Sequence, residues 1–194
     1  INLVDNQIDI NGLVNSVNAD GSFNNGHVMF VSPNGMVVGA SGVLNLGSLT
    51  VLTPEYNNYK KFTSDFDIKG PLAADMTNLY SKGTGTVTID GKVITRDFVD
   101  INAAAVNINN SIMSGVKNSD LITTNAQADI LFNNLVNTDN MKAGNTFPSD
   151  SGSIKITSYS AKEGVNIAEG STLKNFGKGD IEVTSHGEKG ILAN

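Results

Sequence analysis

Apolar residues recur two apart along most of the chain, in short groups that are separated by polar turns. This spacing places the apolar side chains on one face of a β-strand. Residues 32–35 and 39–42 are typical of the turns between the groups, because Gly, Asn and Ser allow the chain to bend sharply. The pairs that define the pattern are Ile8/Ile10, Val28/Phe30, Leu44/Leu46, Leu49/Val51, Val87/Ile89, Val99/Ile101, Val106/Ile108, Ile154/Ile156, Val165/Ile167 and Ile181/Val183.

Strands this short bury a core only when the chain coils and stacks each turn on the previous one. The pattern therefore predicts an all-β fold, a parallel β-helix with three short strands per coil and about 4.8 Å between coils. The pairs that begin at Ile154 and Ile181 are 27 residues apart, which is a plausible length for one coil. A β-sandwich is the alternative, but its strands are usually longer and are joined by hairpins. We expect one domain over residues 1–194.

The segment 53–85 interrupts the pattern of apolar pairs and is predicted to be an insertion outside the coils. Thr53 followed by Pro54 resembles an N-cap and the first position of a helix, and a second short helix is expected from Pro71. A further excursion is expected over residues 138–152, where the apolar pairs disappear. The aromatic residues of the insertion either pack on the coil wall or form an interaction surface, and they are Tyr56, Tyr59, Phe62, Phe66 and Tyr80.

The composition and charge of the chain argue against some classes of binding partner. Charged residues make up 16% of the 194 residues and the net charge is −6, while the chain contains 26 Asn and 20 Gly. Arg96 is the only Arg, so no basic stripe is available for phosphates and nucleic acid is not an expected partner. The chain has no apolar stretch of the roughly 20 residues that cross a bilayer, so no transmembrane segment is expected. Because the sequence begins at Ile1 in a strand-like segment, we expect a fragment of a longer protein.

The sequence offers few residues for catalysis or metal binding. His27 and His186 each lie beside a Gly, and both are predicted to be solvent-exposed turn residues. Neither has a second His three or four residues away, and the chain has no Cys for a thiolate site. Asp65 and Asp67 lack the further ligands of a calcium loop. We therefore predict no metal site and no cofactor, and expect a protein that is not an enzyme.

A polysaccharide lyase or hydrolase that acts on acidic glycans is the enzymatic alternative. A hydrolase needs two carboxyl groups held roughly 5–9.5 Å apart, and Asp97 and Asp100 are the nearest candidates in the sequence. A lyase that acts on uronates usually needs several basic residues, whereas Arg96 is alone. A catalytic site of this kind would otherwise need carboxylates that different coils bring together.

Residues 28–53 resemble the haemagglutination-activity domain, also called the two-partner-secretion domain, of large filamentous adhesins. The resemblance is strongest in the turn Ser32-Pro33-Asn34-Gly35-Met36, which is similar to the family's Asn-Pro-Asn-Gly-Ile motif, and in the strand-like residues 43–49 that follow. Within the family, this stretch most resembles the leukotoxin-like filamentous adhesins of fusobacteria. Two departures are that Ser32 replaces the first Asn of the motif and that no second Asn-Pro-Asn-Leu motif is present.

The resemblance implies a right-handed β-helix that serves as the N-terminal secretion module of a surface or secreted adhesin or leukotoxin. Its implied partner is an outer-membrane transporter, whose periplasmic domains capture the module and whose pore leads to the cell surface or the medium. Residues 32–36 would then carry the secretion motif, and folding outside the cell would nucleate further coils. Strand addition to a sheet edge is a physically sensible mode of capture. Binding to a host cell surface through the insertion is a further alternative.

Overall fold

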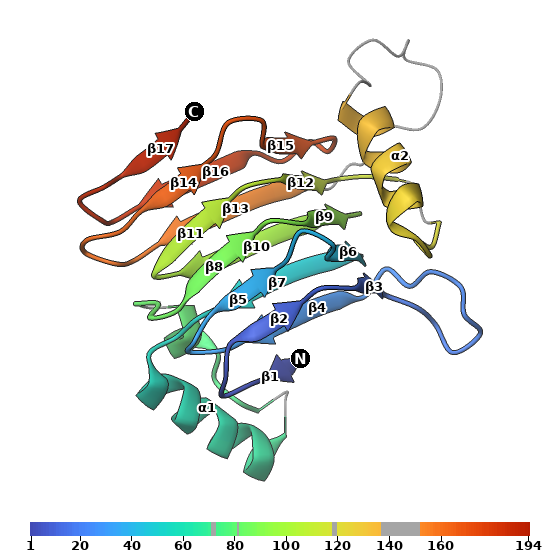
Figure 1. The fold of residues 1–194 in the computed structure, drawn as a ribbon. Helices are drawn as coiled ribbons and strands as arrows, with labels where there is room; N and C mark the ends of the chain where they lie inside the picture. The colour runs from blue at the N-terminus through green and yellow to red at the C-terminus, as the bar shows by residue number, and fades with distance from the viewer. Residues whose placement is uncertain (71–72, 81, 118–119, 137–151) are drawn as a thin grey trace.

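Successive windings of the chain stack into a parallel β-helix, which Figure 1 shows as a column of strands from the N-terminal to the C-terminal coil. The computed structural model describes residues 1–70, 73–80, 82–117, 120–136 and 152–194. In these ranges every pairing between the named strands is parallel. Consecutive strands along the chain belong in turn to three sheets, so each strand pairs with the equivalent strand of a neighbouring coil. The predicted β-helix is confirmed, and the β-sandwich is excluded.

Each sheet collects strands from successive coils, six in sheets A and B and five in sheet C among the described residues. In stacking order, sheet A consists of β1 (Asn2–Leu3), β4 (His27–Val31), β7 (Ser48–Leu52), β10 (Phe98–Ala103), β13 (Ser153–Ser158) and β16 (Ile181–Ser185). Sheet B consists of β2 (Ile8–Ile10), β5 (Met36–Val38), β8 (Thr86–Ile89), β11 (Ala105–Ile108), β14 (Val165–Ile167) and β17 (Ile191–Ala193). Sheet C consists of β3 (Leu13–Asn15), β6 (Val43–Leu46), β9 (Lys92–Thr95), β12 (Ser111–Ser114) and β15 (Thr172–Asn175).

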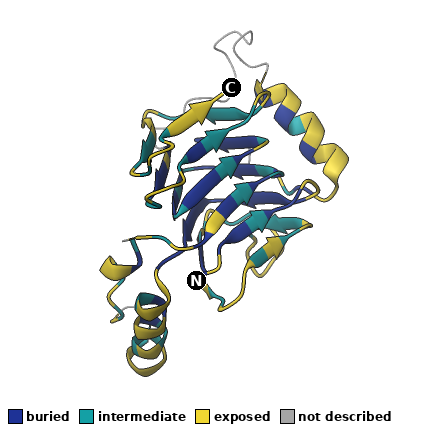
Figure 2. Ribbon diagram, turned by 60° about the vertical axis from the view of Figure 1, so that its left-hand side comes forward, coloured by how far each residue is buried: buried dark blue, intermediate teal, exposed yellow. Residues whose placement is uncertain are grey.

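The inward-facing apolar pairs form one continuous core along the axis of the column. Ile101 in β10 is fully buried, and it is paired with Val51 below and with Ile156 above. Ile154 is paired with Ile181, so the 27-residue spacing does correspond to one coil. Figure 2 shows the buried residues on the strands throughout the middle of the column. The core therefore depends on the register between coils, because each pair is covered by the pair above and the pair below.

The corner between sheets A and B needs glycine where the coils touch most closely. Gly35 has φ +91°, and a Cβ atom built there would lie 2.1 Å from the carbonyl oxygen of Thr86 in the next coil. A left-handed φ disfavours residues with a side chain, and the contact leaves no room for one. Gly35 thus permits both the turn and the stacking of coil on coil.

Helix α1 (Tyr56–Lys69) belongs to the predicted insertion and covers part of the outer face of sheet A. Tyr59 and Phe62 of this helix pack with outward-facing residues of the first coils, among them Val31 and Leu52. The helix start is later than predicted, because Glu55 occupies the N-cap position without a side-chain bond. Thr53 instead belongs to the coil corner, where its hydroxyl donates a hydrogen bond to Gly85 O at 3.0 Å.

The second helix expected in the insertion is a short 3-10 helix, η1 (Thr77–Tyr80), with Leu79 buried against the same outer face. Its predicted start at Pro71 lies outside the described residues. The excursion predicted over 138–152 also lies outside them, except for Gly152.

Helix α2 (Asn125–Val136) was not predicted from the sequence, and it covers the outer face of sheet C (Figure 1). Its buried side chains are Ala128, Phe132 and Leu135, whose spacing of four and three residues is the helical period. They pack on outward-facing residues of the coils, such as Ile94 and Met113. These three positions have the helical period in the sequence, but three positions are too few to predict a helix.

We predict that Ile101→Ala lowers the free energy of unfolding by about 2–5 kcal/mol, because it opens a cavity in the continuous core. Ile68→Ala is the control, since Ile68 on α1 is 78% exposed, and it should change the free energy by less than about 0.5 kcal/mol. Urea unfolding of the two variants measures both values. Similar losses in the two variants would contradict the proposed role of the axial core.

We also predict that Gly35→Ala is more destabilising than Gly170→Ala. Gly170 has a similar φ of +79°, but no atom lies within 4 Å of the position of its Cβ. Gly170→Ala should therefore lower the free energy of unfolding by about 1–2 kcal/mol, the cost of a left-handed conformation for a residue with a side chain. Gly35→Ala adds the clash with Thr86, and urea unfolding should separate the two variants. Equal midpoints of urea unfolding for the two variants would contradict the expected destabilisation by the clash at Gly35.

Candidate functional site

The predicted secretion motif, residues 32–36, forms the corner between sheets A and B in the second coil. Ser32, Pro33, Gly35 and Met36 are buried, and Asn34 is exposed. The Ser32 hydroxyl donates a hydrogen bond to Asn6 O at 2.7 Å and accepts one from Asn34 N at 3.2 Å. Four of the five motif residues are thus accounted for by the packing of this corner in the folded state.

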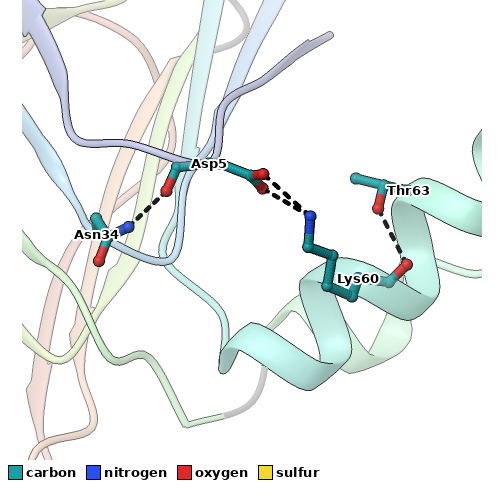
Figure 3. A network of polar contacts seen from close by, with 4 residues as sticks. All are labelled: Asp5, Asn34, Lys60 and Thr63. Atoms are coloured by element: carbon teal, nitrogen blue, oxygen red, sulfur yellow. Dashed lines mark hydrogen bonds and ion pairs between the residues drawn. The ribbon is translucent and has the colours of Figure 1, made fainter.

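Asn34 links the corner to the coil below and, through Asp5, to the insertion. Its side-chain amide donates a hydrogen bond to Asp5 O, and the carboxylate of Asp5 pairs with Lys60 of α1 at 3.0 Å (Figure 3). Both charged side chains are about half exposed, so the ion pair contributes little to stability. The motif and the insertion, which are separate in sequence, therefore adjoin in the structure.

The aromatic residues of the insertion mostly pack against the coils. Tyr59 and Phe62 are buried, and Phe66 and Tyr80 are partly buried against the same cluster. Burial raises the pKa of Tyr59, and the nearby Asp5 raises it further. Tyr56 is 52% exposed and does not belong to this cluster. Packing therefore explains four of the five residues, and Tyr56 is the one that is displayed.

A polar pocket of about 340 Å³ lies on the outer face of sheet A, beyond the end of the insertion. Strands β10, β13 and β16 line it in the last three coils of this sheet. Two columns of paired residues face it: Asp100, Lys155 and Glu182 in one, and Asn102, Thr157 and Thr184 in the other. Asp100, Tyr80 and His186 stand out in the sequence for separate reasons, but only the stacking of coils brings them together with the other residues of this pocket.

Two side chains of β10 are unusually enclosed for polar groups in this pocket. Burial raises the pKa of the Asp100 carboxyl, while the Lys155 ammonium lowers it and the Glu182 carboxylate raises it. Asn102 is only 5% exposed, and its amide donates a hydrogen bond to Tyr80 O at 3.1 Å. The Asn102 Oδ1 atom has no hydrogen-bond partner among the described residues. The pocket thus contains a partly buried carboxyl group, and the amide oxygen of Asn102 beside it is closed to solvent.

The carboxylates considered for a hydrolase do not form a pair in this pocket. Asp100 lines it, whereas Asp97 lies at the corner between sheets C and A, where its backbone N–H donates a hydrogen bond to Gly47 O. The second carboxylate in the pocket is Glu182, from a strand two coils further along. This pairing across coils is not visible in the sequence.

Arg96, the residue considered for a lyase, is buried at a coil corner and does not line this pocket. Its guanidinium donates a hydrogen bond to Asn45 Oδ1 and lies 4.1 Å from the ring centre of Phe23. Burial lowers the pKa of Arg96 to about 10, against the opposing effect of Asp120. The Arg96 side chain is therefore part of the packing of this corner, where it contacts the amide of Asn45 and the ring of Phe23.

The two histidines differ in their placement. His186 follows β16 in a turn-like segment and is exposed, as predicted, and its ring stacks on Tyr159 with 4.8 Å between centres. His27 is also exposed, as predicted, but its predicted place in a turn is wrong, because it begins strand β4 and its Nε2 is hydrogen-bonded to Thr50 Oγ1 at 2.8 Å. Burial and, secondarily, the N-terminal charge lower the pKa of His27, and Asp97 opposes them.

A second pocket, of about 500 Å³, lies near the corner between sheets A and B in the last coils. Its charged residues, Glu163 and Lys189, pair with each other at 2.6 Å. No aromatic residue of the described ranges lines this pocket, whereas Tyr80, Tyr159 and His186 line the pocket on sheet A, so the pocket on sheet A is the better candidate for ligand binding. In the described part of the chain, no three His, Asp or Glu residues are grouped so that they could hold a metal ion.

Neither described helix has the length and hydrophobicity of a membrane span. No protein-family model, no curated protein and no solved structure matches this chain.

Proposed function

We propose that this chain is a secretion module, which a partner outer-membrane transporter recognises and which nucleates the folding of a β-helix at the cell surface or in the medium. The proposal rests on the resemblance of residues 32–36 and their flanking strands to two-partner-secretion domains. The observation that carries it is the stack of parallel coils, in which residues 32–36 form a corner. The module acts by binding and templating, without catalysis.

The stacking of parallel coils supports the templating role. Each coil pairs through its backbone with the neighbouring coils, and its inward apolar side chains are covered by theirs, as Ile101 is by Val51 and Ile156. A folded coil therefore offers N–H and C=O groups and apolar side chains on which another coil can form.

Asn34 is the motif residue best placed for recognition, because the other four are enclosed by the corner. Its side chain contributes one hydrogen bond to the coil below, which is a modest structural role. The transporter would capture residues 32–36 before the corner closes, or contact Asn34 afterwards. In the first case the extended chain adds to a sheet edge of the transporter by strand addition.

Asn34→Ala should reduce secretion of the full-length protein by the partner transporter about tenfold, the factor that corresponds to about 1.4 kcal/mol. Ser41→Ala is the matched control, because Ser41 is also an exposed corner residue whose side chain donates one hydrogen bond to the coil below, to Asn11 O at 2.7 Å. Each variant should lose a similar stability of about 0.5–1.5 kcal/mol. Secretion is measured by immunoblotting of the medium and cell surface, and stability by urea unfolding.

Equal secretion of the two variants would remove the proposed role of Asn34 in recognition. A strain that lacks the partner transporter provides the second control. Undiminished export of the wild-type protein from that strain would contradict the secretion module itself.

A further inference from the structure

The outer face of sheet A is divided into an apolar half and a polar half. In the first three coils, α1 and η1 cover outward-facing residues such as Val31 and Leu52. From β10 onward the equivalent outward positions are polar, and Asn102, Thr157 and Thr184 continue the column that contains Leu52. The polar pocket therefore begins where the insertion ends, and it extends to β16 in the last coil of this sheet.

The two columns of the pocket form a regular grid of hydrogen-bonding groups. Neighbouring members of a column lie on adjacent strands, which are about 4.8 Å apart, and the two columns are separated by two residues along each strand. Hydroxyl groups at Thr157 and Thr184 both donate and accept, while the Asn102 Oδ1 atom beside them is closed to solvent. Such a grid suits a ligand that carries hydroxyl groups at repeated intervals.

The charges of the pocket indicate a neutral ligand. Lys155 lies 4.0 Å from Glu182, so this pair is compensated, and Asp100 adds one further carboxyl group. An anionic ligand would meet this excess negative charge, in a chain whose net charge is already −6. Hydroxyl groups of a neutral ligand can donate hydrogen bonds to the Asp100 carboxyl group without adding charge.

Aromatic side chains border the same pocket. Tyr159 and His186 stack with 17° between their planes, and Tyr80 borders the pocket where it meets the insertion. A flat ring pair provides an apolar face beside polar groups, which is the combination that binding sites use to orient small ligands. The pocket therefore matches a molecule with apolar C–H faces and hydroxyl edges.

We propose that the outer face of β10, β13 and β16 binds a neutral oligosaccharide. Asp100 accepts hydrogen bonds from sugar hydroxyls, Thr157 and Thr184 extend these contacts along the coil axis, and Tyr159 packs against a sugar face. This binding role is separate from secretion, because none of these residues belongs to residues 32–36. It also differs from cleavage of acidic glycans, since the ligand is uncharged and no bond is broken.

The test is isothermal titration calorimetry of the purified protein with four neutral hexasaccharides: maltohexaose, cellohexaose, mannohexaose and xylohexaose. Hexagalacturonate serves as the acidic comparison. At least one neutral hexasaccharide should bind, and binding should exceed that of hexagalacturonate. Absence of binding by all four, or preference for hexagalacturonate, would overturn the proposal.

Variants locate the binding on this face. Thr184→Val keeps the shape of the side chain and removes one hydroxyl, so it should weaken binding about threefold to tenfold. Thr88→Val is the matched control, because Thr88 faces outward from β8 in sheet B and is similarly half-buried. Tyr159→Ala should also weaken binding, with circular dichroism as the check that the coils remain folded. Equal affinities of the Thr184 and Thr88 variants would exclude the proposed site.

Discussion

Hydrogen bonding between the backbones of stacked coils is the interaction on which the structure depends. No strand in the described residues exceeds six residues, so none can bury enough apolar surface to be stable alone. Parallel pairing aligns the inward residues of each coil with those above and below, and Val51, Ile101 and Ile156 are buried as one such column. Pairing and burial are therefore cooperative, because each is complete only when the neighbouring coil is present.

The three outer faces of the column are used differently. α1 and η1 cover the first half of the sheet A face, and α2 covers the sheet C face. Sheet B presents residues such as Thr88 and Asn107, which are half-buried at most. The polar pocket over β10, β13 and β16 is thus the part of sheet A that the insertion leaves open. The insertion that packs on the first coils thus also marks the boundary of the proposed binding face.

The corner at residues 32–36 shows how packing accounts for most of the motif. Gly35 is required by the close approach of Thr86, and Ser32 satisfies backbone groups of its own turn and of the coil below. These needs explain the residue types without any partner. Asn34 remains exposed, and its link through Asp5 to Lys60 places the insertion next to the motif. A recognition role for the motif therefore depends on Asn34, or on capture before the corner folds.

The sequence by itself determined the fold class, because a period of two in short groups separated by Gly and Asn turns is compatible with few architectures. It also located the insertion, and it identified Asp100 as a residue of chemical interest. It did not reveal α2, whose three apolar positions are too few to stand out, nor the strand position of His27, since a neighbouring Gly is typical of turns. Only the tertiary structure decided which residues meet in the polar pocket. Asp100, Lys155 and Glu182 lie far apart in the chain, and the register between coils, which depends on loop lengths that the local pattern does not specify, brings them into one column.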